Sequence, residues 1–107
     1  MVIAELIVNL CMLIKQASDT AETNLDMCRS LSDRIQLIPR LLKQFPDINE
    51  IDETLIQKIY SYCKESHRLI IKYRSASLIQ RMLKASKAKS RFDKMEHDLG
   101  NLFYFNF

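Results

Sequence analysis

The stretch LDMCRSLSDRIQLIPRLLKQF, residues 25–45, decides the fold class, because its apolar side chains recur at steps of three and four. The members of this stripe are Leu25, Cys28, Leu31, Ile35, Ile38, Leu42 and Phe45. Such spacing places a stripe on one face of an α-helix. Pro39 falls inside the pattern, and a proline within a helix removes one backbone hydrogen bond. We therefore predict a helix that kinks or breaks near Ile35 to Ile38 and ends at Pro46.

On the N-terminal side of this stretch, residues 2–17 form a periodic segment that is apolar around most of its circumference. Its main face consists of Ile3, Leu6, Ile7, Leu10, Leu13, Ile14 and Ala17. A helix this apolar is either buried in a core or drawn to lipid, and the sequence leaves both interpretations open. The apolar run of roughly 14 residues is shorter than the ~20 that span a bilayer. No basic region precedes the run, so it is also a poor signal peptide.

On the C-terminal side, the sequence predicts two more long helices. Asp52 closes an acidic loop and is a favourable N-cap for a helix that continues to Tyr73. A short helical piece follows, with Leu78, Ile79, Met82 and Leu83, and Ser86 then caps a last helix with the stripe Phe92, Met95, Leu99, Leu102 and Phe103. The predicted fold is therefore all-α: an antiparallel four-helix bundle with an extra short helix before the last long helix. We expect residues 1–107 to form a single domain.

Composition argues against catalysis and metal binding. The chain has a single glycine, so it has no glycine-rich phosphate loop. The two histidines, His67 and His97, are thirty positions apart, and no acidic or histidine cluster shows metal-ligand spacing. The three cysteines form no CxxC pair, which favours free, buried thiols in a reducing compartment. We predict no enzymatic activity, no cofactor and no metal.

Charge is concentrated in residues 64–94, where ten basic residues face two acidic ones, for a net charge of +8 in a chain of net charge +3. Such a segment favours an anionic partner. Three interpretations remain: a solvated face without a partner, an anionic membrane, or a nucleic acid. Nucleic-acid binding is the least favoured, because the nearby aromatics Tyr62, Tyr73 and Phe92 occupy core stripe positions instead of positions open for stacking on bases.

Three runs of residues resemble one family. Cys28-Arg29-Ser30-Leu31-Ser32-Asp33-Arg34-Ile35, followed by Leu41, Leu42 and Phe45, is similar to the second helix of the N-terminal bundle of mixed lineage kinase domain-like (MLKL) proteins. Leu69-Ile70-Ile71-Lys72-Tyr73 resembles the end of that family's third helix. Arg81-Met82-Leu83-Lys84-Ala85-Ser86 resembles the junction before its fourth helix. The runs agree with the family in order and spacing over residues 5–103.

The resemblance implies a cell-death effector of the MLKL or HeLo-like class, which oligomerises, binds anionic phospholipid and permeabilises membranes. It further implies a cytoplasmic protein that relocates to the plasma membrane on activation. This domain is then the N-terminal part of a longer protein with a kinase-like or nucleotide-binding regulatory region. The alternative hypothesis is a helical protein–protein interaction module without membrane activity.

Candidate site residues follow from the resemblance and the charge pattern together. In animal members of the family, basic residues in the first two helices contact phosphoinositides, whereas this chain has Asp19, Glu22 and Asp26 there, with Lys15, Arg29 and Arg34 as the nearby bases. We therefore place lipid binding in the later basic segment, at Lys84, Lys87, Lys89, Arg91 and Lys94. Membrane insertion is assigned to the apolar first helix, at Ile3, Leu6, Ile7 and Leu10.

Overall fold

The computed structural model describes residues 3–19, 26–44, 51–75, 80 and 85–106. Its elements are α1 (Ile3–Asp19), α2 (Asp26–Ile35), α3 (Leu37–Leu42), α4 (Glu53–Ser75) and α6 (Ala85–Asn106). The described residues contain no strand, and the predicted all-α bundle is confirmed. The extra short helix predicted before α6 lies outside the described residues, except for Gln80, which is helical.

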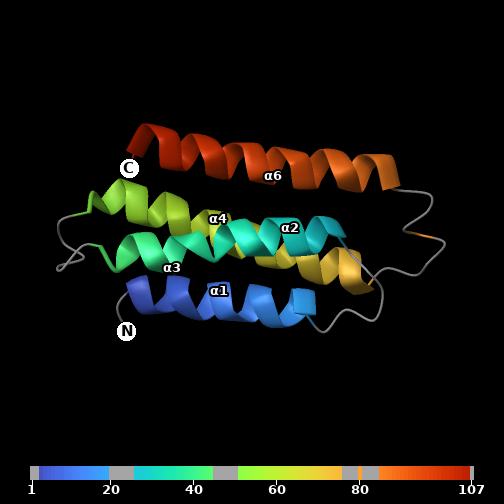
Figure 1. The fold of residues 1–107 in the computed structure, drawn as a ribbon, viewed down its shortest axis with the longest axis horizontal. Helices are drawn as coiled ribbons and strands as arrows, with labels where there is room; N and C mark the ends of the chain where they lie inside the picture. Colours follow the sequence, from blue (N-terminus) through green and yellow to red (C-terminus); the bar gives the residue numbers. More distant parts are fainter. Residues whose placement is uncertain (1–2, 20–25, 45–50, 76–79, 81–84, 107) are drawn as a thin grey trace.

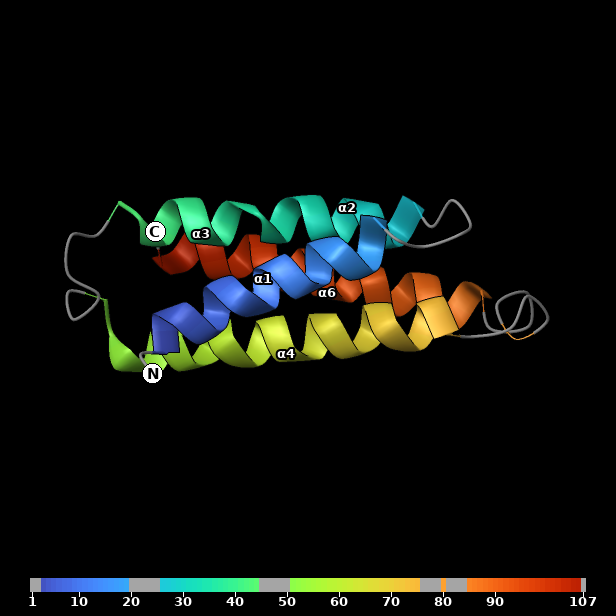
Figure 2. The same ribbon diagram turned by 90° about the horizontal axis from the view of Figure 1, so that it is seen from below.

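The long helices form four corners of a bundle, with α2 and α3 together in one corner (Figures 1 and 2). Each corner runs opposite to the next along the chain, as the antiparallel prediction requires. Helix α1 packs most extensively against α4, to which it runs parallel, and also contacts α2 and α3. Helix α6 contacts α2 and α4 and lies on the far side of the bundle from α1. The helices α1 and α6 therefore occupy opposite corners.

Local sequence accounts for two of the helix boundaries. Asp52 caps α4, because its Oδ1 accepts the backbone N–H groups of Thr54 at 2.7 Å and Leu55 at 3.3 Å. Pro39 separates α2 from α3 as predicted: α2 ends at Ile35, and α3 begins at Leu37 after one turn residue. The prediction for Ser86 was wrong, because α6 already includes Ala85, which places Ser86 inside the helix.

The core contains the stripes that the sequence predicted. Its fully buried members include Ile7 and Ile14 of α1, Leu31 and Ile35 of α2, and Ile59 of α4. Between α4 and α6, the rings of Tyr73 and Phe92 pack edge to face with centroids 5.5 Å apart, a favourable aromatic geometry. All three cysteines are buried and free, which confirms the prediction from their spacing. Tyr62 and Phe92 are buried in the core and Tyr73 is partly buried against it, as expected from their stripe positions.

Helix α1 is less completely buried than its sequence suggested. Leu13 belongs to the predicted face but is 46% exposed, and its neighbour Met12 is 55% exposed. The reason is the corner position of α1, which leaves the side away from α4 and α2 without a packing partner among the described residues. Leu37 of α3 is also exposed, at 44%. The first helix thus buries one face and presents apolar side chains on the other.

Candidate functional site

Basic side chains gather where the second half of α4 lies beside the first half of α6. We call this region the cationic half, and it comprises Lys64, Arg68, Lys72, Arg74, Lys87, Lys89, Arg91 and Lys94. Within residues 64–75 and 85–94, these eight bases face only Glu65 and Asp93, a net charge of +6. The antiparallel course of α4 and α6 brings the two basic runs to the same half of the bundle (Figure 1). An anionic partner is attracted to such a surface.

The structure brings together three of the five predicted lipid-binding residues. Lys87, Arg91 and Lys94 are exposed and follow the i, i+4, i+7 spacing of a single α6 face. Lys89 is exposed as well, but two positions along a helix point in nearly opposite directions, so it lies apart from Lys87. Lys84 lies outside the described residues. The cationic stripe of α6, defined as Lys87, Arg91 and Lys94, is therefore the best-defined part of the surface.

The α4 part of the cationic half was not among the predicted site residues. Lys64, Arg68 and Lys72 are all exposed and come from the helix that contacts α6. Their charge was visible in the sequence, but nothing in the sequence placed α4 beside α6. Lys94 forms an ion pair with Asp98, with Nζ and Oδ2 3.5 Å apart, and both side chains are substantially exposed. An exposed i, i+4 pair of this kind stabilises the helix by less than about 1 kcal/mol, so Lys94 can exchange it for an anionic partner.

The four predicted insertion residues lie on the packed side of α1 or at its margin. Ile7 is completely buried, and Ile3 and Leu10 are partly buried against the core. Leu6 is half-buried. In this closed bundle these side chains contact protein, so they reach lipid only if α1 leaves its corner. Among the described residues of α1, the large apolar side chains most open to solvent are instead Met12 and Leu13.

Two hydrogen bonds fasten α1 to the break between α2 and α3. Pro39 has no N–H to donate to the carbonyl of Ile35, four positions earlier. The thiol of Cys11 donates to that carbonyl, with Sγ and O 4.0 Å apart. In the other direction, Nε2 of Gln36 donates to the carbonyl of Cys11 at 2.9 Å. The backbone group that the proline leaves free is thus used to attach α1.

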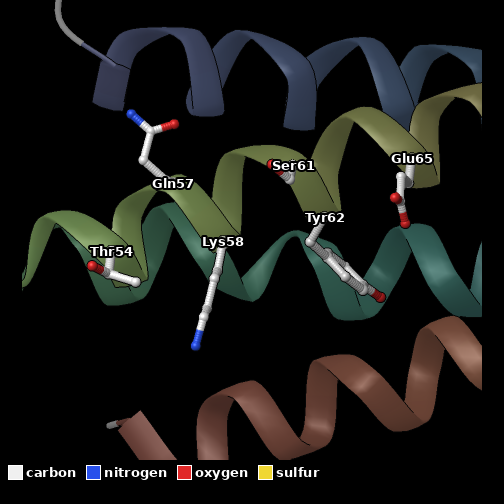
Figure 3. Close-up of a pocket in the computed structure, with 6 residues that line it drawn as sticks. All are labelled: Thr54, Gln57, Lys58, Ser61, Tyr62 and Glu65. Atoms are coloured by element: carbon white, nitrogen blue, oxygen red, sulfur yellow. The ribbon is translucent and has the colours of Figure 1, made fainter.

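A groove of about 370 Å³ runs along α4 and is lined by Thr54, Gln57, Lys58, Ser61, Tyr62 and Glu65 (Figure 3). Figure 3 shows Gln57 extending toward α1 and Lys58 toward α6, so the polar groups do not converge on one point. The Tyr62 hydroxyl donates to the carbonyl of Met95, and burial raises the pKa of Tyr62 above its ordinary value. Tyr62 thus connects α4 to α6, and the groove has the character of a surface furrow.

The described residues contain no group of three or more His, Cys, Asp or Glu side chains arranged to hold a metal ion. His97 contacts Asn101 at 3.2 Å on the surface of α6. None of the helices, over the part that the structure describes, combines the length and the hydropathy needed to cross a membrane.

The family model of the mixed lineage kinase domain-like N-terminal domain matches residues 4–104, nearly the whole chain. The chain belongs to this family. Neither the curated proteins nor the solved structures give a significant match. The matched range covers all three runs on which the resemblance was based, and the helical bundle is the fold expected of the family.

Membership makes this MLKL-type domain a helical domain of the cell-death effector type. The family is associated in general with oligomerisation and membrane interaction. This MLKL-type domain presents its highest positive charge on α4 and α6 and carries its most apolar helix, α1, at the opposite corner from α6. A function for this chain must account for that separation.

Proposed function

We propose that this chain is an MLKL-type cell-death effector that self-associates, binds anionic phospholipid through its cationic half and permeabilises the membrane. The observation that carries the proposal is the convergence of basic residues from α4 and α6 on one half of the bundle. The proposal includes relocation from the cytoplasm to the plasma membrane. It also treats this domain as the N-terminal part of a longer protein with a kinase-like or nucleotide-binding regulatory region.

The electrostatic attraction between an anionic surface and the α6 stripe of a single copy is weak, and this weakness supports self-association. Each Lys or Arg near an anionic surface contributes about 1 kcal/mol, so the cationic stripe of α6 contributes about 3 kcal/mol. A free energy of ~4.1 kcal/mol corresponds to a millimolar Kd, so one stripe holds a monomer only weakly. An oligomer that presents several stripes to the same surface gains avidity of about 10²- to 10⁴-fold. Docking through this stripe alone is therefore stable only when several copies bind the same surface together.

The insertion step requires α1 to leave the bundle. Ile7 is completely buried, and α1 lies across the bundle from α6, so a domain docked through α6 holds α1 away from the lipid. The C-terminal end of α1, at Asp19, lies at the same end of the bundle as the start of α6 (Figure 1). A swing of α1 about that end carries Ile3 and Leu6 toward the surface. Lipid tails are about as apolar as the core, so the α1 side chains themselves lose little hydrophobic free energy in the transfer.

Dye release from vesicles tests the proposal. Wild type is compared with Lys87→Glu/Arg91→Glu/Lys94→Glu on vesicles with and without anionic phospholipid. The matched control is Lys15→Glu/Arg40→Glu/Lys43→Glu, which makes the same change in net charge at exposed positions of α1, α3 and the turn after α3. Circular dichroism establishes that all three proteins remain helical.

We expect release only from anionic vesicles, loss of release in the α6 variant and near-normal release in the control. Equal loss in both variants would mean that net charge matters and that the stripe has no special role. Intact vesicles at high excess of folded wild type would overturn the proposal.

A second candidate function, a protein–protein interaction module without membrane activity, is favoured by the burial of the α1 face. Ile7 is fully buried in the closed bundle, while Met12, Leu13 and Leu37 remain open to a partner. This alternative predicts a complex of defined stoichiometry whose formation does not depend on lipid. Analytical ultracentrifugation with and without anionic vesicles separates the two hypotheses.

A further inference from the structure

Helix α6 has an apolar face that is bordered by basic residues on both sides. Phe92, Met95 and Leu99 form this face and are buried in the core, on the helix that contacts α2 and α4. Arg91 of the cationic stripe lies four positions before Met95, and Lys89 lies three positions before Phe92; both bases are exposed. Residues three or four positions apart are neighbours on a helix surface. Lys89, which lies apart from the cationic stripe, therefore borders the opposite side of the same apolar face.

This arrangement of side chains is typical of a helix that lies in the plane of a membrane interface. In such a helix the apolar face is buried at the boundary between headgroups and acyl chains, while the bases reach the anionic headgroups. It needs neither the length nor the hydropathy of a spanning helix, which no helix has over the part that the structure describes. In the closed bundle the apolar face of α6 is turned to the core, so it meets lipid only if α6 swings outward.

Glu96 fastens α6 to α2 at one border of the apolar face. It lies four positions after Phe92 and three before Leu99. The Ser30 hydroxyl of α2 donates to Oε1 of Glu96, and Nε of Arg34 lies 3.7 Å from the same oxygen. A hydrogen bond to an ionised acceptor is stronger than one between neutral groups. We call Ser30, Arg34 and Glu96 the Glu96 latch.

The packing of α6 also favours its opening. Its contacts with α2 and α4 are together less extensive than the contact of α1 with α4 alone. On the α4 side, α6 is held by the hydrogen bond from Tyr62 to the carbonyl of Met95 and by the ring contact between Tyr73 and Phe92. A segment with less packing opens at a lower free energy. Opening of α6 therefore disrupts less of the bundle than release of α1 does.

We propose that α6 is an interfacial membrane helix and that the Glu96 latch holds it in the bundle. On an anionic phospholipid surface the latch opens and α6 swings outward. The bases on its two borders then bind headgroups, and the face of Phe92, Met95 and Leu99 enters the boundary of the acyl chains. This inference rests on the proposed function and deepens it, because it names the helix that enters the lipid first and the contact that restrains it.

Amide hydrogen exchange of α6 in the absence of lipid tests the latch. Ser30→Ala removes the donor to Glu96 without changing the net charge, and Ser90→Ala makes the same change at an exposed position of α6 as the matched control. Loss of a hydrogen bond to a charged group should make α6 open and exchange about tenfold faster. The control should exchange at the wild-type rate. Wild-type exchange in Ser30→Ala would overturn the latch.

Tryptophan fluorescence tests where the apolar face goes, because the natural chain contains no tryptophan. Phe103→Trp places a probe on the side of α6 that is partly buried against the core, and Tyr104→Trp places the control probe at a position that is 82% exposed. Each protein is mixed with phosphatidylcholine vesicles, with and without phosphatidylserine, whose acyl chains carry bromine as a quencher. Sedimentation with the vesicles measures binding, and quenching measures entry into the lipid.

We expect strong quenching of the Phe103→Trp probe by the anionic vesicles and weak quenching of the Tyr104→Trp probe. Adding Ser30→Ala to Phe103→Trp should bring half-maximal quenching at about tenfold less lipid, because a larger fraction of molecules is open. Binding without quenching of the Phe103→Trp probe, or equal quenching of the two probes, would overturn the interfacial seating of α6.

The failure of this inference and the failure of the proposed function give different results. Sedimentation with anionic vesicles without quenching leaves docking through the cationic half standing and overturns the seating of α6 alone. Quenching of the Phe103→Trp probe without dye release supports the seating of α6 and counts against permeabilisation. Folded wild type that does not sediment with anionic vesicles would overturn both.

Discussion

The packing of α1 is tested most directly at Ile7, which is completely buried between α1 and its neighbours. Changing Ile7 to Ala removes three carbon atoms, at about 0.8 kcal/mol each for the loss of burial. The cavity left behind raises the total to about 3–4 kcal/mol, within the range measured for large-to-small core changes. A domain of this size has a stability of about 5–15 kcal/mol, so the variant should remain folded but weakened.

Urea unfolding followed by circular dichroism measures this loss, with Met12→Ala in the same helix as the matched control. Met12 is 55% exposed, so its truncation should cost less than about 1 kcal/mol. The rate at which Cys11 reacts with a thiol reagent reports the opening of α1 itself, and Ile7→Ala should raise that rate. Equal losses of stability in the two variants would refute the assignment of the α1 inner face, and with it the requirement that α1 be released before insertion.

Two further changes test the helix cap and the contact between α4 and α6. Asp52→Ala should lower the free energy of unfolding by about 1 kcal/mol, because two backbone N–H groups at the start of α4 lose their acceptor; urea unfolding against the exposed control Glu53→Ala measures it, and an unchanged midpoint would contradict the cap. Tyr62→Phe should cost about 1 kcal/mol at neutral pH through the lost hydrogen bond to Met95. Burial raises the pKa of Tyr62, so the unfolded chain loses the phenol proton first, and stability should fall as the pH rises above about 10. The difference in unfolding free energy between wild type and Tyr62→Phe should therefore shrink above that pH, and a constant difference would show that Tyr62 ionises equally in both states.

The positions of α1 and α6 constrain how such a domain is able to act. Under the proposed function, a domain docked through α6 holds α1 on the side away from the membrane, so electrostatic docking and insertion would be separate events. The hydrogen bonds that attach α1 to Gln36 and to the carbonyl of Ile35 would then determine how readily insertion follows docking. Weakening the attachment favours release, and strengthening it keeps docked molecules inactive.

Local sequence determined the elements themselves. Helix periodicity specifies which side chains are buried together, and it correctly identified Ile35, Ile59 and Phe92 as core. Asp52 and Pro39 act on the backbone within four residues of their own positions. Their effects on the start of α4 and on the break after α2 could therefore be predicted from the sequence. The buried, free state of the cysteines followed from their spacing alone.

Tertiary structure decided which faces meet. Every helix here has an apolar stripe of similar character, so the sequence carries no simple signal that α1 packs beside α4 and across from α6. That choice depends on how side chains from distant segments fit together, which is a property of the assembled core. It alone brought the Cys11 thiol to the carbonyl of Ile35, brought the basic run of α4 beside that of α6, and exposed Leu13 where the periodic pattern had placed it inside.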